Sequence, residues 1–438
     1  MKTIENYDVR IFTDNIEESA TEQIKALLSV PVFSRCKIRI MPDVHAGAGC
    51  VIGFTGNLGE RVIPNIVGVD IGCGIYVQPF ACSGEINYHA LNEFILRHIP
   101  SGRNYRDEQY AVLPPKYIEM YSQAKGLIKK LRCYRELKDI KRLDHSVGSL
   151  GGGNHFIELD NDDSGMMHLV VHTGSRNLGK QVAQIYQKLA VKCQSGWAEL
   201  MIEQNRLIAE YKAAGRKDEL QDVIRELHNS FKMYKPTIPA DLSYVEGAYR
   251  EDYLHDMRLC QEWAKINRRL IVGLLMDYLK QQDCVQTPEE TWQDLAFESV
   301  HNYIGDDNII RKGAIAAYSG QKCIIPLNMR DGSLICIGKG NEDWNFSAPH
   351  GAGRIMSRAQ AFRSISLEDY RQSMQGIYSE CLVEETKDES PMVYKPKDEI
   401  IGNIHDTVNI VNVINAENGA YPPNQNGLIH PQLSLKWA

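Results

Sequence analysis

The pattern of hydrophobic and polar residues divides the chain into two glycine-rich parts with short strands, separated by a helical part. Between residues 180 and 285 glycine is sparse, and apolar residues recur at intervals of three and four, as at Val182, Ile185 and Leu189. This is the period of an α-helix with one buried face. The same period continues from Met257 to Leu274. We therefore expect residues 180–285 to form a helical excursion from the rest of the fold.

Short apolar or alternating runs, typical of β-strands, lie on both sides of this excursion. Strands and helices are interspersed without a regular alternation, which predicts an α+β fold with a single core of mixed strands flanked by helices. No linker rich in Pro, Ser or Gly divides the chain, so residues 1–438 are predicted to form one domain, with 415–438 as a turn-rich, flexible tail. The predicted strands are residues 37–40, 169–171, 322–325 and 333–337.

The composition indicates a folded protein rather than a disordered one, because 43% of the 438 residues are hydrophobic and 24% are charged. No apolar run approaches the roughly 18 residues of a membrane span, and the N-terminus lacks a signal-peptide pattern. The 11 cysteines form no CxxC pair, as expected for reduced, buried thiols. We expect a cytoplasmic protein without a membrane partner, with monomer as the default. The net charge of −7 excludes a globally basic surface for nucleic acid, but not a local patch or a bound metal.

Residue types that bind metals are concentrated in glycine-rich loops. Asp70 and Cys73 are three positions apart among glycines that allow close approach of the backbone, and His155, His172 and His301 follow in other loops. Five ligands are too many for one tetrahedral zinc ion but suit two adjacent divalent ions that share a thiolate. Taken singly, each residue is more often a hydrogen-bonded histidine, a buried thiol or a turn-forming aspartate. The pattern therefore suggests a metal site without establishing one.

Two further segments carry histidines beside small residues. His350 precedes Gly351-Ala352-Gly353-Arg354, where an arginine and free backbone N–H groups suit a phosphate and the imidazole is a competent nucleophile. The alternative is a glycine-rich turn with an incidental histidine. Asp43 and His45 would share one side of an extended segment. They would form either a carboxylate–imidazole pair for proton handling or phosphate contact, or a structural hydrogen-bonded pair.

Taken in order, seven short segments resemble motifs of the RtcB family of RNA ligases. The resemblance implies an RtcB-like fold with a metal-lined cleft. It also implies that the chain joins RNA 3′-phosphate or 2′,3′-cyclic phosphate ends to 5′-hydroxyl ends, using GTP and Mn²⁺, in RNA repair or tRNA splicing. The segments are residues 41–45, 68–74, 153–158, 172–176, 301–303, 311–313 and 350–358.

The resemblance also assigns roles to individual residues. Asp70, Cys73 and His155 would hold one Mn²⁺, and Cys73, His172 and His301 would hold a second. His350 would take GMP from GTP, and Asp43 is the candidate for proton transfer in the last steps. The candidates for contact with the RNA backbone are Arg176, Arg354 and Arg358. The residues expected around the nucleotide are Asn154, His155, Phe156, Ile157, Glu158, His301, Asn302, Pro326, Leu327, Asn328, Met329, Ser333, His350, Gly351, Ala352, Gly353 and Arg354.

Three positions depart from the family pattern. Ala48 stands where the family commonly has a lysine between two glycines, and residues 326–329 read Pro-Leu-Asn-Met instead of Pro-Gly-Ser-Met. No lysine occupies the C-terminal position that contacts the guanine nucleotide, although Lys436 lies further on. These changes bear on guanine selectivity and on the choice of RNA. The altered loop motivates an alternative, a metal-dependent RNA-end phosphoesterase without ligation. A non-catalytic RNA- or nucleotide-binding relative is a third reading, which the retained ligands disfavour.

Overall fold

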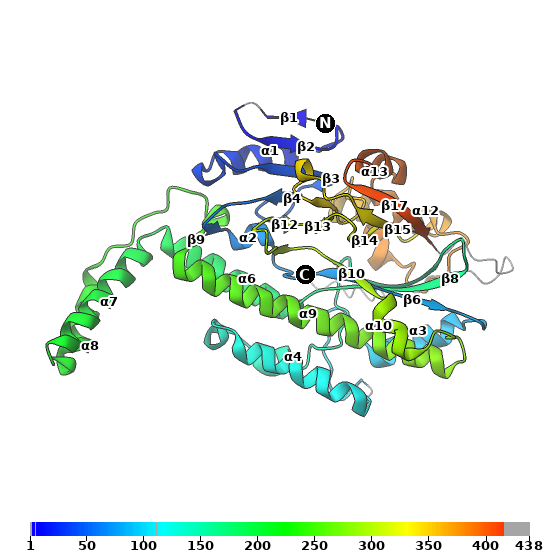
Figure 1. Cartoon of the computed structure of the whole chain (residues 1–438), viewed down its shortest axis with the longest axis horizontal. Coiled ribbons are helices and arrows are strands. Elements are labelled where there is room, and N and C mark those ends of the chain that lie inside the picture. The colour runs from blue at the N-terminus through cyan, green and yellow to red at the C-terminus, as the bar shows by residue number, and fades with distance from the viewer. Residues whose placement is uncertain (1, 5, 111, 416–438) are drawn as a thin grey trace.

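Three β-sheets and the long helix α9 (Gly247–Gln281) organise the fold in the computed structural model, which describes residues 2–4, 6–110 and 112–415 (Figure 1). The mixture of sheets and helices confirms the α+β prediction. A six-stranded sheet has the order β1-β2-β3-β4-β12-β11, in which only β2 and β3 are parallel. Its strands are β1 (Lys2–Thr3), β2 (Val9–Ile11), β3 (Ile38–His45), β4 (Ile52–Gly56), β11 (Tyr303–Ile304) and β12 (Ile310–Lys312).

A four-stranded antiparallel sheet lies beside α9 and has the order β10-β6-β8-β7. Its strands are β6 (Gly74–Ala81), β7 (Phe156–Asn161), β8 (Met166–Thr173) and β10 (Phe297–Val300). A three-stranded sheet has the order β14-β15-β17, with β14 (Lys322–Asn328), β15 (Gly332–Gly338) and β17 (Val408–Ile414). Two short ladders are β13 (Ala314–Ala316) with β16 (Ser347–Pro349), and β5 (Arg61–Val62) with β9 (Val245–Glu246).

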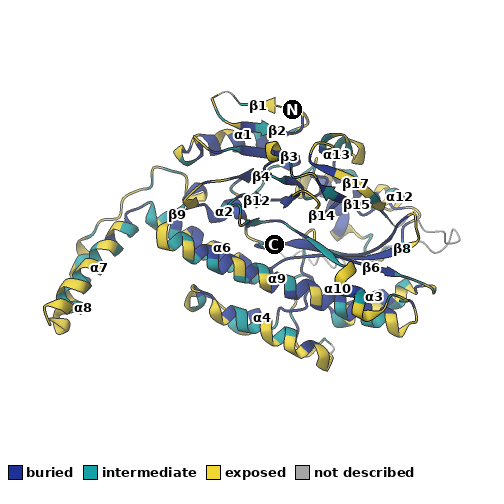
Figure 2. Cartoon of the chain, viewed as in Figure 1, coloured by how far each residue is buried: buried dark blue, intermediate teal, exposed yellow. Residues whose placement is uncertain are grey.

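The helices cover the sheets and supply much of the core. α9 packs against α4 and α6 and also against β6 and β8, so it is buried along most of its length, including the fully buried Trp263 (Figure 2). In contrast, α7 and α8 project from the body and are largely exposed (Figures 1 and 2). The helices are α1 (Glu18–Leu28), α2 (Pro64–Val67), α3 (Tyr88–His98), α4 (Ile118–Lys130), α5 (Ile140–Asp144), α6 (Arg176–Cys193), α7 (Trp197–Ala213), α8 (Leu220–Ser230), α9 (Gly247–Gln281), α10 (Trp292–Leu295), α11 (Arg358–Ser364), α12 (Leu367–Ser373) and α13 (Lys397–Ile404).

The elements agree with several local predictions. Three of the four predicted strands fall within β8, β14 and β15, and the fourth, residues 37–40, begins one residue before β3. The two helical periodicities fall within α6 and α9. All 11 cysteines are free thiols, and eight of them are buried. Among the described residues, no helix is long and apolar enough to cross a bilayer. Residues 416–438, which include most of the predicted tail and Lys436, lie outside the described residues.

Candidate active site

Four of the five candidate metal ligands lie at one end of the four-stranded sheet. Cys73 immediately precedes β6 and His155 precedes β7, whereas His172 lies near the end of β8 and His301 follows β10. Because neighbouring strands are antiparallel, the beginning of one strand lies beside the end of the next. The register places Gly74 opposite both Thr173 and Val300. The strand order therefore brings together side chains that are up to 228 positions apart in the sequence.

The ligand atoms converge closely. Cys73 Sγ lies 3.3 Å from Nε2 of both His155 and His172. His155 Nε2 lies 2.9 Å from Asp70 Oδ2, and His172 Nε2 lies 3.4 Å from His301 Nε2. Two groups of three residues each have ligand atoms within 4.8 Å of one another, namely Cys73, His172 and His301, and Asp70, Cys73 and His155. Cys73 belongs to both groups, which is the arrangement that the resemblance implied.

Backbone carbonyl groups orient two of the imidazoles. Nδ1 of His155 donates a hydrogen bond to the Leu150 carbonyl, and Nδ1 of His172 donates one to the Asn154 carbonyl, each over 2.9 Å. With the proton on Nδ1, the lone pair on Nε2 points into the cluster. This carbonyl support is the usual arrangement behind a metal-binding histidine, because it fixes the tautomer and the ring orientation.

The electrostatics of the cluster favour a bound cation. Burial, followed by the neighbouring imidazoles, lowers the pKa of His172 and His301 well below the usual value, so both rings are neutral at neutral pH and able to bind a cation. Burial and the charge of Asp70 raise the pKa of the Cys73 thiol, so a cation that binds there must displace a proton. Burial would raise the pKa of Asp70, but His155 and Arg176 outweigh it and lower that pKa. A mixed sulfur, nitrogen and oxygen set of this kind suits divalent transition-metal ions.

His350 lies beside this cluster, directly after β16. Its ring centroid is 4.8 Å from that of His301. Nδ1 of His350 donates to Asp43 Oδ2 over 2.6 Å, and the backbone N–H of His350 donates to the same oxygen over 3.2 Å. Because the carboxylate oxygen accepts both hydrogen bonds, Nδ1 carries the proton, and in the neutral tautomer of this imidazole the free lone pair is on Nε2. Asp43 is fully buried, whereas His350 lines a cavity.

Asp43 and His45 form a hydrogen-bonded pair, but the Asp43 carboxylate takes no part in it. Nδ1 of His45 donates instead to the backbone carbonyl of Asp43, over 2.9 Å. The pairing of β3 with β4 is irregular between Ile40 and His45, so the simple alternation assumed for this segment does not hold. The carboxylate is left to contact His350, which is 307 positions away.

Glycine at position 353 allows the segment after His350 to lie against β3. Gly353 has a φ of +77°, and a Cβ atom there would lie 2.3 Å from the Asp43 carbonyl oxygen. Any other residue would push the segment away from β3 and separate His350 from Asp43. This packing gives a structural reason for the small residues that follow His350 in the sequence.

A cavity of about 510 Å³ opens in front of His350 and runs along β7 and the loop between β14 and β15. Many residues expected around the nucleotide line it: Asn154, Phe156, Glu158, Pro326, Leu327, Asn328, Met329, His350, Gly351, Ala352, Gly353 and Arg354. The structure does not bring His155, Ile157, His301, Asn302 or Ser333 into this lining. Ile157 points to the opposite face of β7, and the Asn302 side chain donates to the Asp70 carbonyl and accepts from the Gly313 N–H.

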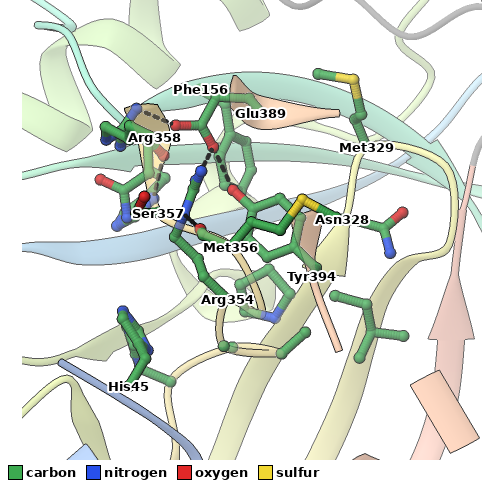
Figure 3. Close-up of a pocket in the computed structure, with 18 of the residues that line it drawn as sticks. His45, Phe156, Asn328, Met329, Arg354, Met356, Ser357, Arg358, Glu389 and Tyr394 are labelled. Atoms are coloured by element: carbon green, nitrogen blue, oxygen red, sulfur yellow. Dashed lines mark hydrogen bonds and ion pairs between the residues drawn. The ribbon is translucent and has the colours of Figure 1, made fainter. Parts of the chain in front are cut away.

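Glu389 lies in the cavity wall and contacts three other side chains of that wall, which the sequence did not indicate. Its carboxylate contacts the Tyr394 hydroxyl and lies 2.5 Å from Nη1 of Arg358 and 3.5 Å from Nη1 of Arg354 (Figure 3). Arg358 also pairs with Asp388. The partners are 5 to 35 positions apart without a local motif. Glu17, Ser19, Ala46, Gly332, Met356, Ser357, Glu389 and Tyr394 are lining residues for which sequence reasoning assigned no role.

Arg176 lies away from the cavity wall. Its guanidinium donates to the Gly102 carbonyl over 2.7 Å and to Ser149 Oγ over 3.3 Å, and a Cβ at Gly151 would collide with it. The charge of Arg176 nevertheless acts on Asp70. In this structure Arg176 therefore holds the loops around Gly102 and Ser149 in place, beside the candidate metal ligands.

Comparison with known proteins agrees with the site. The family model described as "tRNA-splicing ligase RtcB" matches residues 23–416. The chain belongs to the RtcB family. It is 31% identical to the RNA-splicing ligase RtcB of Escherichia coli (strain K12) over 437 residues, covering 93% of this chain and 96% of that protein. It is 24% identical to the tRNA-splicing ligase RtcB of Methanococcus maripaludis, covering 90% of this chain and 89% of that protein.

Two of the departures from the RtcB pattern have visible structural consequences. The carbonyl of Ala48 accepts a hydrogen bond from the buried Lys312 Nζ over 2.5 Å, so a lysine side chain reaches this segment from β12. In the altered loop, Asn328 Oδ1 accepts from the N–H groups of Arg330 and Asp331. This oxygen of Asn328 is thus used in a local turn, although the residue lines the cavity.

Proposed function

We propose that the chain is a GTP- and Mn²⁺-dependent RNA ligase that joins 3′-phosphate or 2′,3′-cyclic phosphate ends to 5′-hydroxyl ends through GMP carried on His350. The observation that supports this most strongly is the position of His350. His350 lies beside the two groups of candidate metal ligands and lines the cavity, and its Nδ1 is held by a buried carboxylate. The names of the related proteins support an RNA substrate.

The residues of the chain can account for the chemistry. Nε2 of His350 attacks the α-phosphate of GTP and pyrophosphate leaves, while Nδ1–H donates to Asp43 as positive charge develops on the ring. A 2′,3′-cyclic phosphate end must first be hydrolysed by water to a 3′-phosphate and a free 2′-hydroxyl. An oxygen of the RNA 3′-phosphate then attacks the phosphorus on His350, takes GMP and restores the imidazole. The 5′-hydroxyl attacks this activated end and expels GMP, so that one phosphodiester is formed. Divalent ions held by the cluster would offset negative charge on the phosphates.

The cavity wall supplies groups suited to a nucleotide and its phosphates. Arg354 and Arg358 are cations in this wall, and the Arg354 guanidinium lies 5.5 Å from the centre of the Tyr394 ring. The Glu389 carboxylate contacts Arg354, Arg358 and Tyr394 and so fixes the positions of these three side chains in the wall. An aromatic face beside cations is a common way to hold a base and the adjacent phosphate.

Labelling with GTP tests the proposal. Incubation with α-labelled GTP and Mn²⁺ should leave the label on the protein, and His350→Ala should abolish it. His405→Ala, at an exposed position, is a matched control that should label normally. RNA with a 3′-phosphate and a 5′-hydroxyl should then be joined as the label is lost from the protein. A wild-type protein that neither labels nor joins RNA would contradict the proposal.

The altered loop favours one alternative, a metal-dependent phosphoesterase acting on RNA ends. Because Asn328 is engaged in a turn with Asp331, the loop offers fewer free polar groups to a nucleotide. Release of phosphate from RNA ends without GTP and without joined product would support this alternative. Covalent labelling of His350 would contradict it.

A further inference from the structure

Helix α6 carries positive charge without a carboxylate of its own. Its sequence, Arg176–Cys193, contains one arginine and three lysines but no aspartate or glutamate. The three lysines, Lys180, Lys188 and Lys192, are all exposed, and together they form what we call the lysine stripe of α6. This local excess of positive charge stands against a net charge of −7 for the whole chain.

The charges of the stripe are not balanced by neighbouring side chains. In the part of the chain that the structure describes, none of the three lysines forms an ion pair with a carboxylate. The projecting helix α7 shows the usual arrangement of an exposed helix, because Arg206 pairs there with Glu203 and Glu210. Like charges four positions apart, as at Lys188 and Lys192, destabilise a helix. An exposed face that keeps such charges together is suited to an anionic partner.

A second basic segment lies against the same helix. The Lys138 N–H donates to Gln181 Oε1 over 2.7 Å, and Gln181 Nε2 donates to the Lys138 carbonyl over 3.1 Å. Lys138 therefore lies beside the beginning of the lysine stripe, and Lys141 follows three positions later. Both are exposed, and among the described residues neither pairs with a carboxylate. The carboxylate between them in the sequence, Asp139, caps the N-terminus of α5.

The stripe begins beside the loop of candidate metal ligands. A Cβ atom at Gly179 would lie 3.1 Å from the backbone nitrogen of Ile71, so the start of α6 packs directly against this loop. A Cβ atom at Gly174, two positions before α6, would lie 2.3 Å from Asp70 Oδ1. The Asp70 side chain is 28% exposed, whereas the other four candidate ligands are buried. The candidate ligand that solvent reaches is therefore one that lies beside the start of α6.

The far end of the stripe carries an aromatic ring. Nζ of Lys192 lies 5.2 Å from the centre of the Trp197 ring. Lys180 and Lys192 are 12 positions apart, or about 18 Å along the helix axis. At about 3.4 Å per phosphate in a stacked strand, this length corresponds to about five phosphates. Cations that follow the backbone, with an aromatic ring for a base, are typical of surfaces that bind single strands without reading their sequence.

We propose that the exposed side of α6, with Lys138 and Lys141 beside it, binds the sugar–phosphate backbone of the RNA substrate outside the cavity. The inference rests on the proposed function and extends it from the reacting ends to the body of the RNA. A strand whose end reaches the candidate metal ligands beside Asp70 can continue along α6. Contacts of this kind supply affinity and orientation but no sequence selectivity. An acidic protein would match the same charge, and it is the partner that unchanged RNA binding would indicate.

Salt-dependent RNA binding tests this surface without any reaction. The probe is a single-stranded RNA of about 20 nucleotides, longer than the stripe, with hydroxyl groups at both ends. Fluorescence anisotropy across a range of KCl concentrations gives the affinity and its salt dependence. The combined variant Lys180→Gln, Lys188→Gln and Lys192→Gln should lower the slope by about 2, at about 0.7 per lost phosphate contact, and the affinity in 0.1 M KCl about 100-fold. The loss should be equal for oligo(U) and oligo(A).

Arginine substitutions separate loss of charge from damage to the helix. The combined variant Lys180→Arg, Lys188→Arg and Lys192→Arg keeps three cations, so its affinity should stay within about threefold of wild type and its slope should be unchanged. A loss of RNA binding in this variant as large as that in the glutamine variant would overturn the proposal, because charge would then not be the cause.

A second control removes charge from other parts of the surface. Lys2, Lys25 and Lys339 are exposed lysines of β1, of α1 and of the position after β15. The combined variant Lys2→Gln, Lys25→Gln and Lys339→Gln changes the net charge as much as the α6 variant does. Its affinity for RNA should stay within about twofold of wild type. An equal loss in both glutamine variants would overturn the assignment to α6.

The outcome is separable from that of the ligase proposal. Labelling by GTP needs no RNA, and its rate should be equal in the wild-type protein and the α6 glutamine variant, because the stripe does not line the cavity. If the wild type labels and joins RNA but the variant binds RNA with wild-type affinity and slope, the ligase proposal stands and the α6 surface is overturned. If the wild type does not label, RNA binding that depends on the stripe still supports the surface. A wild-type protein that does not bind RNA at low salt overturns it.

Discussion

Replacement of Asp43 by asparagine isolates the charge behind His350. In the wild-type protein, Asp43 Oδ2 accepts from both the ring Nδ1–H and the backbone N–H of His350. An asparagine oxygen at the same place can accept both hydrogen bonds, so the geometry is kept and the negative charge is lost. The amide nitrogen would take the place of Oδ1, which is buried and has no partner in the described part of the chain. This adds a stability cost of about 1–3 kcal/mol.

The expected loss in the rate of GMP transfer follows from the difference between a hydrogen bond to a charged carboxylate and one to a neutral amide. A hydrogen bond to a charged group contributes about 1.5–3 kcal/mol, and one between neutral groups about 0.5–1.5 kcal/mol. The difference of about 1–2 kcal/mol corresponds to a 5- to 30-fold slower transfer of GMP to His350, at 1.36 kcal/mol per factor of ten. Affinity for GTP should change little, because Asp43 does not line the cavity. Asp43→Ala removes the acceptor altogether and should be slower still.

Single-turnover labelling with saturating α-labelled GTP and Mn²⁺ measures this step without RNA. His350→Ala sets the background, and equal metal content in all variants excludes an indirect effect through the cluster. A labelling rate of Asp43→Asn equal to that of the wild type would refute the reasoning. If labelling is unchanged but joining of RNA to the labelled protein is slow, Asp43 acts in proton transfer during the last steps instead.

Further predictions concern the metal ligands, the cavity wall and acid stability. Cys73→Ser removes the ligand common to both groups, so equilibrium dialysis should show loss of Mn²⁺ from both; retention of two ions would contradict a shared thiolate. Because burial and Asp70 raise the pKa of the Cys73 thiol, metal binding should release a proton and tighten as pH rises, as calorimetry in buffers of different ionisation enthalpy can show. Glu389→Gln should raise KM for GTP severalfold with little change at saturation. Burial raises the pKa of Asp162, but hydrogen bonds, including one from His168, lower it to about 2, so this carboxylate stabilises the fold above about pH 4. That contribution of roughly 2 kcal/mol should disappear between pH 4 and pH 2, and acid titration of Asp162→Ala should lack this component.

The metal ligands show what the sequence can and cannot supply. The residue types and their glycine-rich surroundings are visible in the sequence, and the family resemblance grouped them around Cys73. Their convergence depends on the strand order β10-β6-β8-β7, in which β10 follows β8 by more than 120 residues in the chain. Hydrophobic periodicity predicts strands but not which strands pair at such separations. Periodicity alone therefore could not place His301 beside His172; the family resemblance predicted that they share a site, and the strand order explains how they meet.

The cavity wall was less accessible to prediction than the metal cluster. Glu389 contacts partners brought near by tertiary packing, and it does not lie in a motif of glycines or histidines. The burial of Asp160 was equally hard to predict, because a polar residue in a strand of alternating character is normally exposed. Its face of β7 also carries Phe156, which packs with Ile414 of β17 in a small hydrophobic cluster.

Residues 154–156 belong both to the lining of the cavity and to the surroundings of the candidate metal ligands. Asn154 lines the cavity, while its carbonyl accepts the Nδ1–H of the metal-ligand candidate His172. The next residue, His155, is a ligand candidate of the other group, and Phe156 again lines the cavity. A nucleotide that moves this segment must therefore also move one imidazole of each group. We therefore expect occupation of the cavity to change the geometry of the candidate metal ligands through residues 154–156, and binding of a metal to change the affinity of the cavity in return.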